Sequence, residues 1–458
     1  MLPSGTRREF LDTTSRLVTA ATAAGFTQSL AAGRAHAAGS DEIQLALIGC
    51  GGRGGGAAGD ALSVPDGRLK LVAMADIFKD RTDIVRRSLS EQFKERIDVP
   101  QERTFIGMEA FKQAIDCLRP GDIAISATPP AFRAAHFQYA IEKGVHLFME
   151  KPVSIDGPST RRIIELAGKA EEKRLKVAVG LMCRHSEARR ELYDRLKNGE
   201  AGDLLAFRGY RMHPAVQSMD LFPGPPEGMS ELFWQAKRFH GFLWASGGIF
   251  SDYCVHHIDE ACWMKDAWPV KAEGVGGRHY KGKLDDQNFD SYAVEYTFDD
   301  GAKFFYASRS MKNCEQKFGL FGQGSKGAFT ISVSGHSPAK STIYKSQKME
   351  KDNIHWTAPQ PEKSPYRLEW EHFVAAIRND EPYNEAKRGA EASLVTAMGR
   401  FAAHTGKEVT FEEMLNSTDD LTAGVATLTD TSPAILLAGA DGRYPVPMPG
   451  KFKFEYRD

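Results

Sequence analysis

The fold is decided by residues 43–56, IQLALIGCGGRGGG. Residues 43–48 form a short and almost continuously apolar run, which is typical of a strand buried in a parallel sheet. A glycine-rich turn with the spacing G-x-G-x-x-G follows at residues 49–54, and residues 55–62 then continue as a helix. This order of strand, turn and helix predicts the first unit of a doubly wound α/β sheet.

Each glycine of this turn has a physical role in holding a dinucleotide. Gly49 permits the tight turn, Gly51 lets the backbone approach a pyrophosphate, and Gly54 allows the helix to pack closely on the strand. The pyrophosphate is then held at the helix N-terminus, where unpaired N–H groups and the helix dipole favour an anion. Gly52 and Arg53 lie in the same loop, so we expect them to bind the cofactor too.

The next apolar run indicates which cofactor is held. Residues 69–75 are strand-like and end at Asp76, close to the spacing at which an acidic side chain takes the ribose hydroxyls. A carboxylate there repels a 2′-phosphate, so the sequence favours NAD over NADP. Lys79 and Arg81 lie just beyond Asp76 and keep NADP as the alternative, because they are able to serve a phosphate.

Further apolar runs at α/β spacing predict more parallel strands of the same sheet: 122–127, 145–149 and 176–180. Ligands of such sheets bind beyond the carboxyl ends of the strands. Thr128 and Pro129 follow one of these ends and are expected over the nicotinamide side of the crevice. Glu150 and Lys151 follow another, which puts Lys151 where substrate meets cofactor.

The pattern changes after residue 180. Strand-like runs now occur without intervening helices: 204–211, 270–276, 291–298, 302–308, 317–321 and 328–333. Residues 299–301 predict a hairpin turn and residues 322–327 another. The fold class is therefore α/β plus α+β: an N-terminal Rossmann dinucleotide-binding domain and a C-terminal domain built on an open-faced, mainly antiparallel sheet.

The segment 246–259, SGGIFSDYCVHHID, carries the candidate chemistry. As a helix starting near Gly248 it places Asp252 and His256 on one face at i, i+4. An imidazole oriented by a carboxylate can take the proton of an alcohol whose carbon loses hydride. Lys151 would donate to the same oxygen and stabilise the alkoxide as it forms.

Two other interpretations of this segment are open. Asp252 and His256 are also compatible with a purely structural helix pair. A metal held by His256, His257 and Asp259 is harder to build, because adjacent histidines point to different faces of a helix, and we expect no metal site.

Composition excludes some partner classes. The chain has 458 residues, and its 59 Lys and Arg nearly balance its 60 Asp and Glu, giving a formal net charge of -1. This balance offers no electrostatic reason to expect nucleic acid or a membrane surface as a partner, so a small molecule is the expected ligand. The six cysteines show no CxxC spacing, and we expect free thiols.

The N-terminus has the features of an export signal. Arg7 and Arg8 form a twin-arginine start, a weakly apolar stretch follows at residues 17–30, and residues 35–37 supply the small-x-small pattern for cleavage. We therefore expect a periplasmic or secreted protein. The predicted organisation is a twin-arginine signal peptide, a Rossmann domain, a substrate and oligomerisation domain, and a surface-wrapping or partner-reaching tail: 1–38, 41–180, 181–424 and 425–458.

The glycine turn, the sequence Glu150-Lys151-Pro152 and the segment 247–259 together resemble the Gfo/Idh/MocA oxidoreductases, over residues from about 43 to at least 410. The last segment matches that family's pattern G-G-x-x-x-D-x-G-x-H-x-x-D. The resemblance implies Lys151, Asp252 and His256 as catalytic residues, and a sheet domain that mediates dimers or tetramers. The family's glycine between Asp and His is Cys254 here, which we expect to alter the floor of the pocket.

These observations predict an exported oxidoreductase that acts on a sugar or polyol carbinol. Free nicotinamide cofactor is not expected outside the cytoplasm, so the dinucleotide would be retained, as the resemblance to glucose-fructose oxidoreductases implies. Transient oxidation, elimination and re-reduction, as in the family's NAD-dependent α-N-acetylgalactosaminidases, would make the protein a net glycoside hydrolase. A non-catalytic sugar-binding protein is the second alternative. Substrate contacts are sought at four polar residues, with structural or solvated positions as the alternative: Arg184, His185, Asp259 and Arg278.

Overall fold

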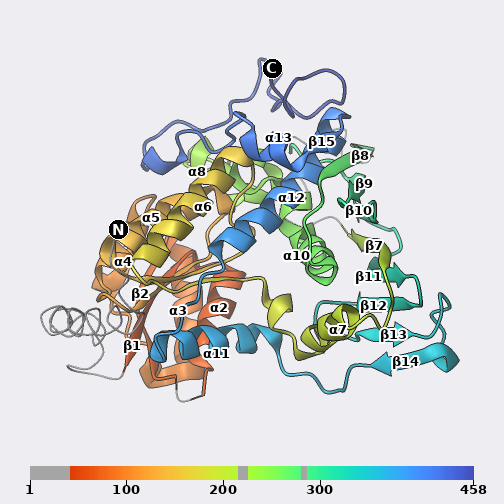
Figure 1. Ribbon diagram of the computed structural model, residues 1–458. Coiled ribbons are helices and arrows are strands. Elements are labelled where there is room, and N and C mark those ends of the chain that lie inside the picture. Colours follow the sequence, from red (N-terminus) through yellow and green to blue (C-terminus); the bar gives the residue numbers. More distant parts are fainter. Residues whose placement is uncertain (1–41, 66, 215–224, 280–285) are drawn as a thin grey trace, which may run out of the picture.

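The computed structural model describes residues 42–65, 67–214, 225–279 and 286–458. The predicted signal peptide, residues 1–38, lies outside these ranges. Two β-sheets lie side by side, with helices on their faces and between them (Figure 1). Among the described residues no helix has the length and apolar character needed to cross a membrane.

The first sheet has six parallel strands in the order β3-β2-β1-β4-β5-β6. Their bounds are β1 Ile43–Ile48, β2 Leu69–Asp76, β3 Thr104–Ile106, β4 Ile123–Ser126, β5 His146–Met149 and β6 Val177–Val179. This is the strand order of a dinucleotide-binding Rossmann domain, with the topological switch point between β1 and β4. The predicted doubly wound sheet is confirmed.

Helices cover both faces of this sheet. Those that connect its strands are α2 Gly52–Leu62, α3 Lys79–Phe93, α4 Ala110–Asp116, α5 Arg133–Lys143 and α6 Gly157–Glu172. The face bearing α2 and α3 is completed by α11, Pro365–Arg378, whose Trp370 and Phe373 are fully buried against it. The first layer therefore extends beyond the predicted boundary at residue 180, because an amphipathic helix from the distant part of the chain covers apolar surface that α2 and α3 leave.

The second sheet has nine strands in the order β14-β13-β12-β11-β7-β10-β9-β8-β15. Their bounds are β7 Leu204–His213, β8 Lys271–Gly277, β9 Ser291–Thr297, β10 Lys303–Ser310, β11 Lys317–Gly324, β12 Ala328–Val333, β13 Thr342–Tyr344, β14 Ile354–Thr357 and β15 Val409–Thr410. All its pairs are antiparallel except β7 with β10. The mainly antiparallel second domain is confirmed.

Sequence patterns missed the margins of this sheet. β13, β14 and β15 have two to four residues each, which is too short for a period-two pattern to show. The turn predicted at residues 322–327 begins later, because β11 continues to Gly324.

One face of the second sheet is covered and the other is open. Helices α10, Gly248–Lys265, and α12, Ala386–Thr405, pack on the inner face, where Tyr296 and Phe304 are fully buried. On the outer face Val275 is 71% exposed and Phe305 45%. The remaining helices are α7 Glu187–Lys197, α8 Glu231–Lys237, α9 Leu243–Ser246 and α13 Phe411–Asn416.

Helix α12 lies between the two sheets and joins them (Figure 1). Two glycines allow this close packing. A Cβ at Gly389 would lie 2.9 Å from the Val179 side chain of the first sheet, and a Cβ at Gly399 would lie 2.0 Å from the Tyr296 hydroxyl of the second. Larger residues at these positions would push the helix away from both sheets.

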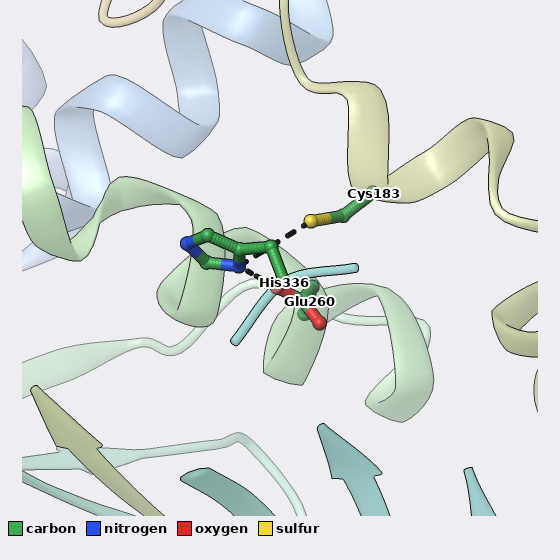
Figure 2. Close-up of side chains that lie close together, drawn as sticks. All are labelled: Cys183, Glu260 and His336. Carbon is green, nitrogen blue, oxygen red and sulfur yellow. Dashed lines mark hydrogen bonds and ion pairs between the residues drawn. The ribbon is translucent and has the colours of Figure 1, made fainter. Parts of the chain in front are cut away.

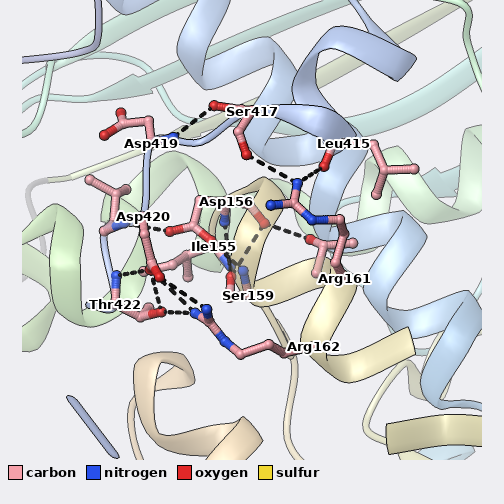
Figure 3. A network of polar contacts seen from close by, with 12 residues as sticks. Ile155, Asp156, Ser159, Arg161, Arg162, Leu415, Ser417, Asp419, Asp420 and Thr422 are labelled. Atoms are coloured by element: carbon pink, nitrogen blue, oxygen red, sulfur yellow. Dashed lines mark hydrogen bonds and ion pairs between the residues drawn. The ribbon is translucent and has the colours of Figure 1, made fainter. Parts of the chain in front are cut away.

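The start of α6 is fastened to the segment that follows α13 (Figure 3). Asp156 and Ser159 form a capping box, and the other carboxylate oxygen of Asp156 accepts the Leu421 N–H at 2.7 Å. Arg162 donates to the Asp420 carboxylate at 2.9 and 3.2 Å. Arg161 donates to the Ser417 carbonyl at 3.0 Å.

The C-terminal tail packs on its own chain. Its Leu436, Tyr444 and Tyr456 are buried in a cluster with residues of both domains. Near the end, the Glu455 carboxylate accepts from the Arg400 guanidinium at 2.8 and 2.9 Å and lies 2.7 Å from His404 Nδ1. Burial raises the pKa of Glu455, but Arg400 and His404 outweigh it and lower that pKa to about 2. The last residues are therefore held by an ionised, fully paired carboxylate.

Replacing Glu455 by Ala should destabilise the protein by about 3–5 kcal/mol, because Arg400 would be left buried without its counter-charge. Urea unfolding followed by circular dichroism measures this loss. Glu408→Ala, which removes the exposed partner of Lys271, is the control and should cost no more than about 1 kcal/mol. Equal effects of the two variants would contradict the assigned role of Glu455.

Candidate active site

A cleft of about 750 Å³ lies where the carboxyl ends of the first sheet meet the start of α10. All the residues predicted to bind cofactor or to act in catalysis line it: Gly49, Gly51, Gly52, Arg53, Gly54, Asp76, Thr128, Pro129, Glu150, Lys151, Asp252 and His256. The tertiary fold thus brings residues from positions 49 to 256 into one cavity.

The glycine turn has the geometry of a dinucleotide cradle. Gly49 has φ +91°, and a Cβ there would lie 2.7 Å from the Ala127 carbonyl carbon. A Cβ at Gly54 would lie 1.9 Å from the Gly49 carbonyl oxygen, so helix and strand touch at this point. Cβ atoms at Gly51 and Gly52 would meet nothing within 4 Å. Open space therefore lies over the N-terminus of α2, where a pyrophosphate would be held.

Asp76 ends β2 beside this cradle. Its carboxylate accepts the Cys50 N–H at 2.7 Å and the Phe78 N–H at 2.9 Å, so it also braces the glycine turn. Of the two cations considered for a 2′-phosphate, only Arg81 lines the cleft. Lys79 pairs with Asp83 at 2.6 Å on the surface. The residues present thus fit a dinucleotide at the switch point of the sheet.

Arg53 and Glu150 are paired to each other across the cleft wall. Arg53 Nε donates to Glu150 Oε1 at 2.6 Å, and the guanidinium lies 5.0 Å from the Tyr366 ring centre. A Cβ at Gly180 would lie 2.9 Å from the Glu150 carboxylate. Glu150 is therefore a buried support of the loop rather than an exposed ligand.

Thr128 is held by a buried arginine. Arg133 Nη1 donates to the Thr128 hydroxyl at 2.9 Å, and Arg133 Nε donates to the Glu150 carbonyl at 2.9 Å. Burial lowers the pKa of Arg133 to about 10, against the attraction of Glu150 and then Asp252. Arg133 thus ties the loops after β4 and β5 together at the edge of the cleft.

Lys151 and Asp252 form the central ion pair of the cleft. Lys151 Nζ donates to the Asp252 carbonyl at 2.6 Å and to Asp252 Oδ1 at 3.1 Å. The other carboxylate oxygen lies 2.9 Å from His240 Nε2. Burial raises the pKa of Asp252, but Lys151 and then His240 outweigh it and hold that pKa well below its usual range. An ammonium has three N–H donors, so one donor of Lys151 remains for a substrate oxygen.

His256 lies one turn after Asp252 but is not oriented by it. Both Asp252 carboxylate oxygens are engaged elsewhere, and His256 Nδ1 is buried without a hydrogen-bond partner among the described residues. This corrects the predicted Asp252–His256 pair: the carboxylate holds Lys151 and His240 instead. Burial, followed by the nearby His336 and Lys151, holds the pKa of His256 well below its usual value. A neutral imidazole is the form that can accept a proton.

Several residues of the cleft were missed by the sequence patterns. They are Arg211 from β7, His240 from the 3₁₀ turn Phe239–Gly241, Tyr253 from α10, His336 from the loop after β12 and Tyr366 from α11. Tyr253 adjoins a predicted site residue, which is a usable signal. The others come from distant segments with no recognisable motif, so only the tertiary fold identifies them.

The four residues proposed for substrate contacts do not line the cleft. Arg184 pairs with Asp259 through two hydrogen bonds of 2.7 and 2.8 Å. His185 Nδ1 lies 2.9 Å from His372 Nδ1, and Arg278 donates to the Asn288 carbonyl at 2.8 Å. Their polar groups contact other residues of the protein, so these positions fit the alternative that they are structural.

Cys254 also lies elsewhere than expected. It is fully buried in the core between α10 and the second sheet, with Sγ 3.6 Å from the Ser308 hydroxyl, and it does not line the cleft. Cys254 therefore packs behind α10, and its side chain is not part of the cleft floor.

Residues 43–181 match the Gfo/Idh/MocA family model, described as an oxidoreductase family with an NAD-binding Rossmann fold. The N-terminal domain has the Rossmann fold that this family description names. An inositol 2-dehydrogenase from Corynebacterium glutamicum is 32% identical over 169 residues, which are 36% of this chain and 42% of that enzyme. One from Leifsonia xyli subsp. xyli is 30% identical over 112 residues, 24% of this chain and 32% of that enzyme. The chain thus matches less than half the length of these relatives.

Solved structures share the fold of both domains. An oxidoreductase from Thermotoga maritima has TM-score 0.62 and 16% identity, covering 82% of this chain and 100% of that one. Myo-inositol 2-dehydrogenase from Lactobacillus plantarum has TM-score 0.58 and 18% identity, covering 81% and 99%. Aldose-aldose oxidoreductase from Caulobacter crescentus, complexed with glycerol, has TM-score 0.58 and 17% identity, with the same coverage.

Gly51→Val should abolish dinucleotide binding without unfolding the protein. Gly51 has an extended backbone with φ -78°, and its added side chain would meet no protein atom but would fill the space over the N-terminus of α2. Isothermal titration of the dinucleotide-free protein with NAD should show a loss of affinity of at least about a hundredfold, or about 2.7 kcal/mol.

Gly168→Val is the matched control, because Gly168 also has open space but lies on α6 away from the cleft. Its NAD affinity should equal that of the unsubstituted chain. Tight NAD binding by Gly51→Val would place the dinucleotide elsewhere.

Proposed function

We propose that this protein is an NAD-dependent oxidoreductase that acts on a secondary alcohol of a sugar or cyclic polyol. The observation that carries the proposal is one cleft that holds both the glycine cradle and the group Lys151, Asp252 and His256. The matching relatives named inositol 2-dehydrogenase support the substrate class. NAD is preferred to NADP because Asp76 faces the cleft at the end of β2.

The dinucleotide, when bound, supplies the acceptor for a hydride from the alcohol carbon. The remaining work falls to the protein's own residues. The free N–H donor of Lys151 binds the substrate oxygen and favours negative charge on it as the proton leaves. His256 accepts that proton through Nε2, because its Nδ1 is the buried nitrogen. Asp252 acts by fixing Lys151.

We further propose that the protein is located outside the cytoplasm and that its dinucleotide stays bound throughout the catalytic cycle. The support for export is the twin-arginine pattern of Arg7 and Arg8. The support for retention is the tail, whose Asp430 accepts the Met108 N–H at 2.7 Å and so braces a loop of the cleft. With a resident cofactor, the hydride would return either to a second sugar or to the same substrate, after its aglycone has been eliminated and water has added in its place. The second route is net glycoside hydrolysis.

We further propose assembly into dimers or tetramers through the open face of the second sheet. Val275 and Phe305 supply exposed apolar surface there, flanked by the charged side chains of Arg208 and Glu273. Such a patch is typical of an interface.

The full-length chain, expressed in a host with a twin-arginine system and recovered from the periplasm, tests this function. Its intact mass should be that of a chain that begins near Ala38. Light scattering should give the mass of a dimer or tetramer. Denaturation should release about one NAD per chain. Inositols, free sugars and glycosides are then offered. A rise in absorbance near 340 nm reports oxidation, and released reducing ends report hydrolysis. A chain that carries no dinucleotide and gains no activity on adding NAD would refute the oxidoreductase assignment.

His256→Gln should lower kcat by about 10²–10⁴-fold, because the proton acceptor is lost. Lys151→Met should lower it by about 10²–10³-fold, because the substrate oxygen loses its charged donor. Both variants should retain NAD, measured by mass spectrometry after denaturation. His372→Gln, on α11 and outside the cleft, is the control with unchanged turnover. Loss of NAD together with activity would make His256 structural.

A further inference from the structure

Three side chains of metal-ligating type meet at the border of the cleft, outside the catalytic group. They are Cys183 from the 3₁₀ helix Met182–His185, Glu260 from α10 and His336 from the loop after β12. One ligand atom of each lies within 4.8 Å of the others. Figure 2 shows the His336 ring on one side of the Cys183 sulfur and the Glu260 carboxylate, with dashed lines from Nδ1 to both.

The distances are those of ligands that converge on one point. His336 Nδ1 lies 3.6 Å from Cys183 Sγ and 3.4 Å from Glu260 Oε1. A single ring nitrogen carries at most one proton, so it cannot be a full donor to both groups at once. In a tetrahedral site with metal–ligand bonds of about 2.0–2.3 Å, neighbouring ligand atoms are separated by distances similar to these two separations from His336 Nδ1.

The carboxylate provides a second and independent observation. Glu260 is fully buried, and its Oε2 accepts from Arg189 Nε at 2.6 Å. Its Oε1 is buried and makes no hydrogen bond in the part of the chain that the structure describes, and its ion-pair contact with His336 Nδ1 is long, at 3.4 Å. A buried, unsatisfied carboxylate oxygen is costly unless a further cation binds to it.

We propose that Cys183, Glu260 and His336 bind a divalent transition-metal ion of the zinc class. Thiolate sulfur, imidazole nitrogen and carboxylate oxygen are all ligands of zinc. The thiolate and the carboxylate together match the charge of the ion. The three ligands come from three separate elements, so the tertiary fold, and not a local sequence motif, brings them together.

The position of the site connects it to the cleft. His336 lines the cleft, and its ring centre lies 4.6 Å from that of His256. Structural zinc sites usually have four protein ligands, whereas catalytic sites have three and an open position for water or substrate. This site has three, so its fourth position would be left for a water or another small ligand.

Metal loading of the full-length chain tests the proposal, whether or not the chain proves to be an oxidoreductase. The protein is treated with a chelator, incubated with Zn²⁺ and passed through a gel-filtration column. Elemental analysis should then find one zinc per chain. Loading with Co²⁺ instead should produce the near-ultraviolet charge-transfer absorption of a thiolate bound to cobalt.

Two substitutions assign the ligands. Cys183→Ser should abolish the cobalt–thiolate absorption, and His336→Gln should weaken Zn²⁺ affinity by at least about tenfold. Cys262→Ser is the matched control, because Cys262 is a buried thiol on the same helix as Glu260 but lies outside the cluster. Its metal content and spectrum should be unchanged.

A chain that binds neither Zn²⁺ nor Co²⁺ stoichiometrically would overturn the proposal. Unchanged metal binding in both Cys183→Ser and His336→Gln would also overturn it, because the ion would then lie elsewhere. Thermal melting shows whether each variant is folded. Where a variant does not fold, the cobalt spectrum of the unsubstituted chain decides: absence of the thiolate band refutes the site.

Discussion

The candidate active site depends on a contact between two residues that are far apart in the chain. Lys151 follows β5 of the first sheet, Asp252 lies in the second turn of α10, and their side chains form a largely buried ion pair. Removing a partner from such a pair leaves an uncompensated charge in a poorly solvated place. The pair therefore fixes the loop at the carboxyl end of β5 to the helix that carries His256. Both side chains line the cleft that also contains the glycine cradle.

The rest of the second domain keeps α10 in that position. Arg400 of α12 donates to the Gly247 carbonyl and to the Ser251 hydroxyl, at the start of α10. Its remaining donors are taken by Glu455 and by the Ile155 carbonyl, so one buried guanidinium connects tail, both domains and catalytic helix. The tail is thus part of the site's support. Rigid supports of this kind preorganise catalytic groups before substrate binds.

Buried polar atoms without a hydrogen bond occur in several parts of the described chain, and two of them lie on α10. His256 Nδ1 and Glu260 Oε1 are both buried without a hydrogen bond among the described residues, and both side chains lie beside His336. Two other polar residues of α10 have hydrogen-bond partners within the protein: Asp259 accepts from Arg184, and His257 Nδ1 lies 3.1 Å from the Tyr306 hydroxyl. An unsatisfied buried group in a native structure calls for an explanation, such as a catalytic role or a bound ion. On α10 these two atoms belong to the side chains for which we propose catalysis and metal binding.

The sequence by itself determined the doubly wound sheet, its glycine cradle and the three residues expected in catalysis. These are local signals: an apolar run followed by G-x-G-x-x-G needs only neighbouring residues to be recognised, and strand ends mark ligand positions in such sheets. The tertiary structure decided which polar side chains face each other. In the folded chain, Asp252 contacts Lys151 and His240 instead of His256. Arg184 pairs with Asp259, and Cys254 is buried in the core. It also brought His336 beside α10, because contacts between distant segments follow from how helices and sheets pack and leave no periodic pattern in the chain.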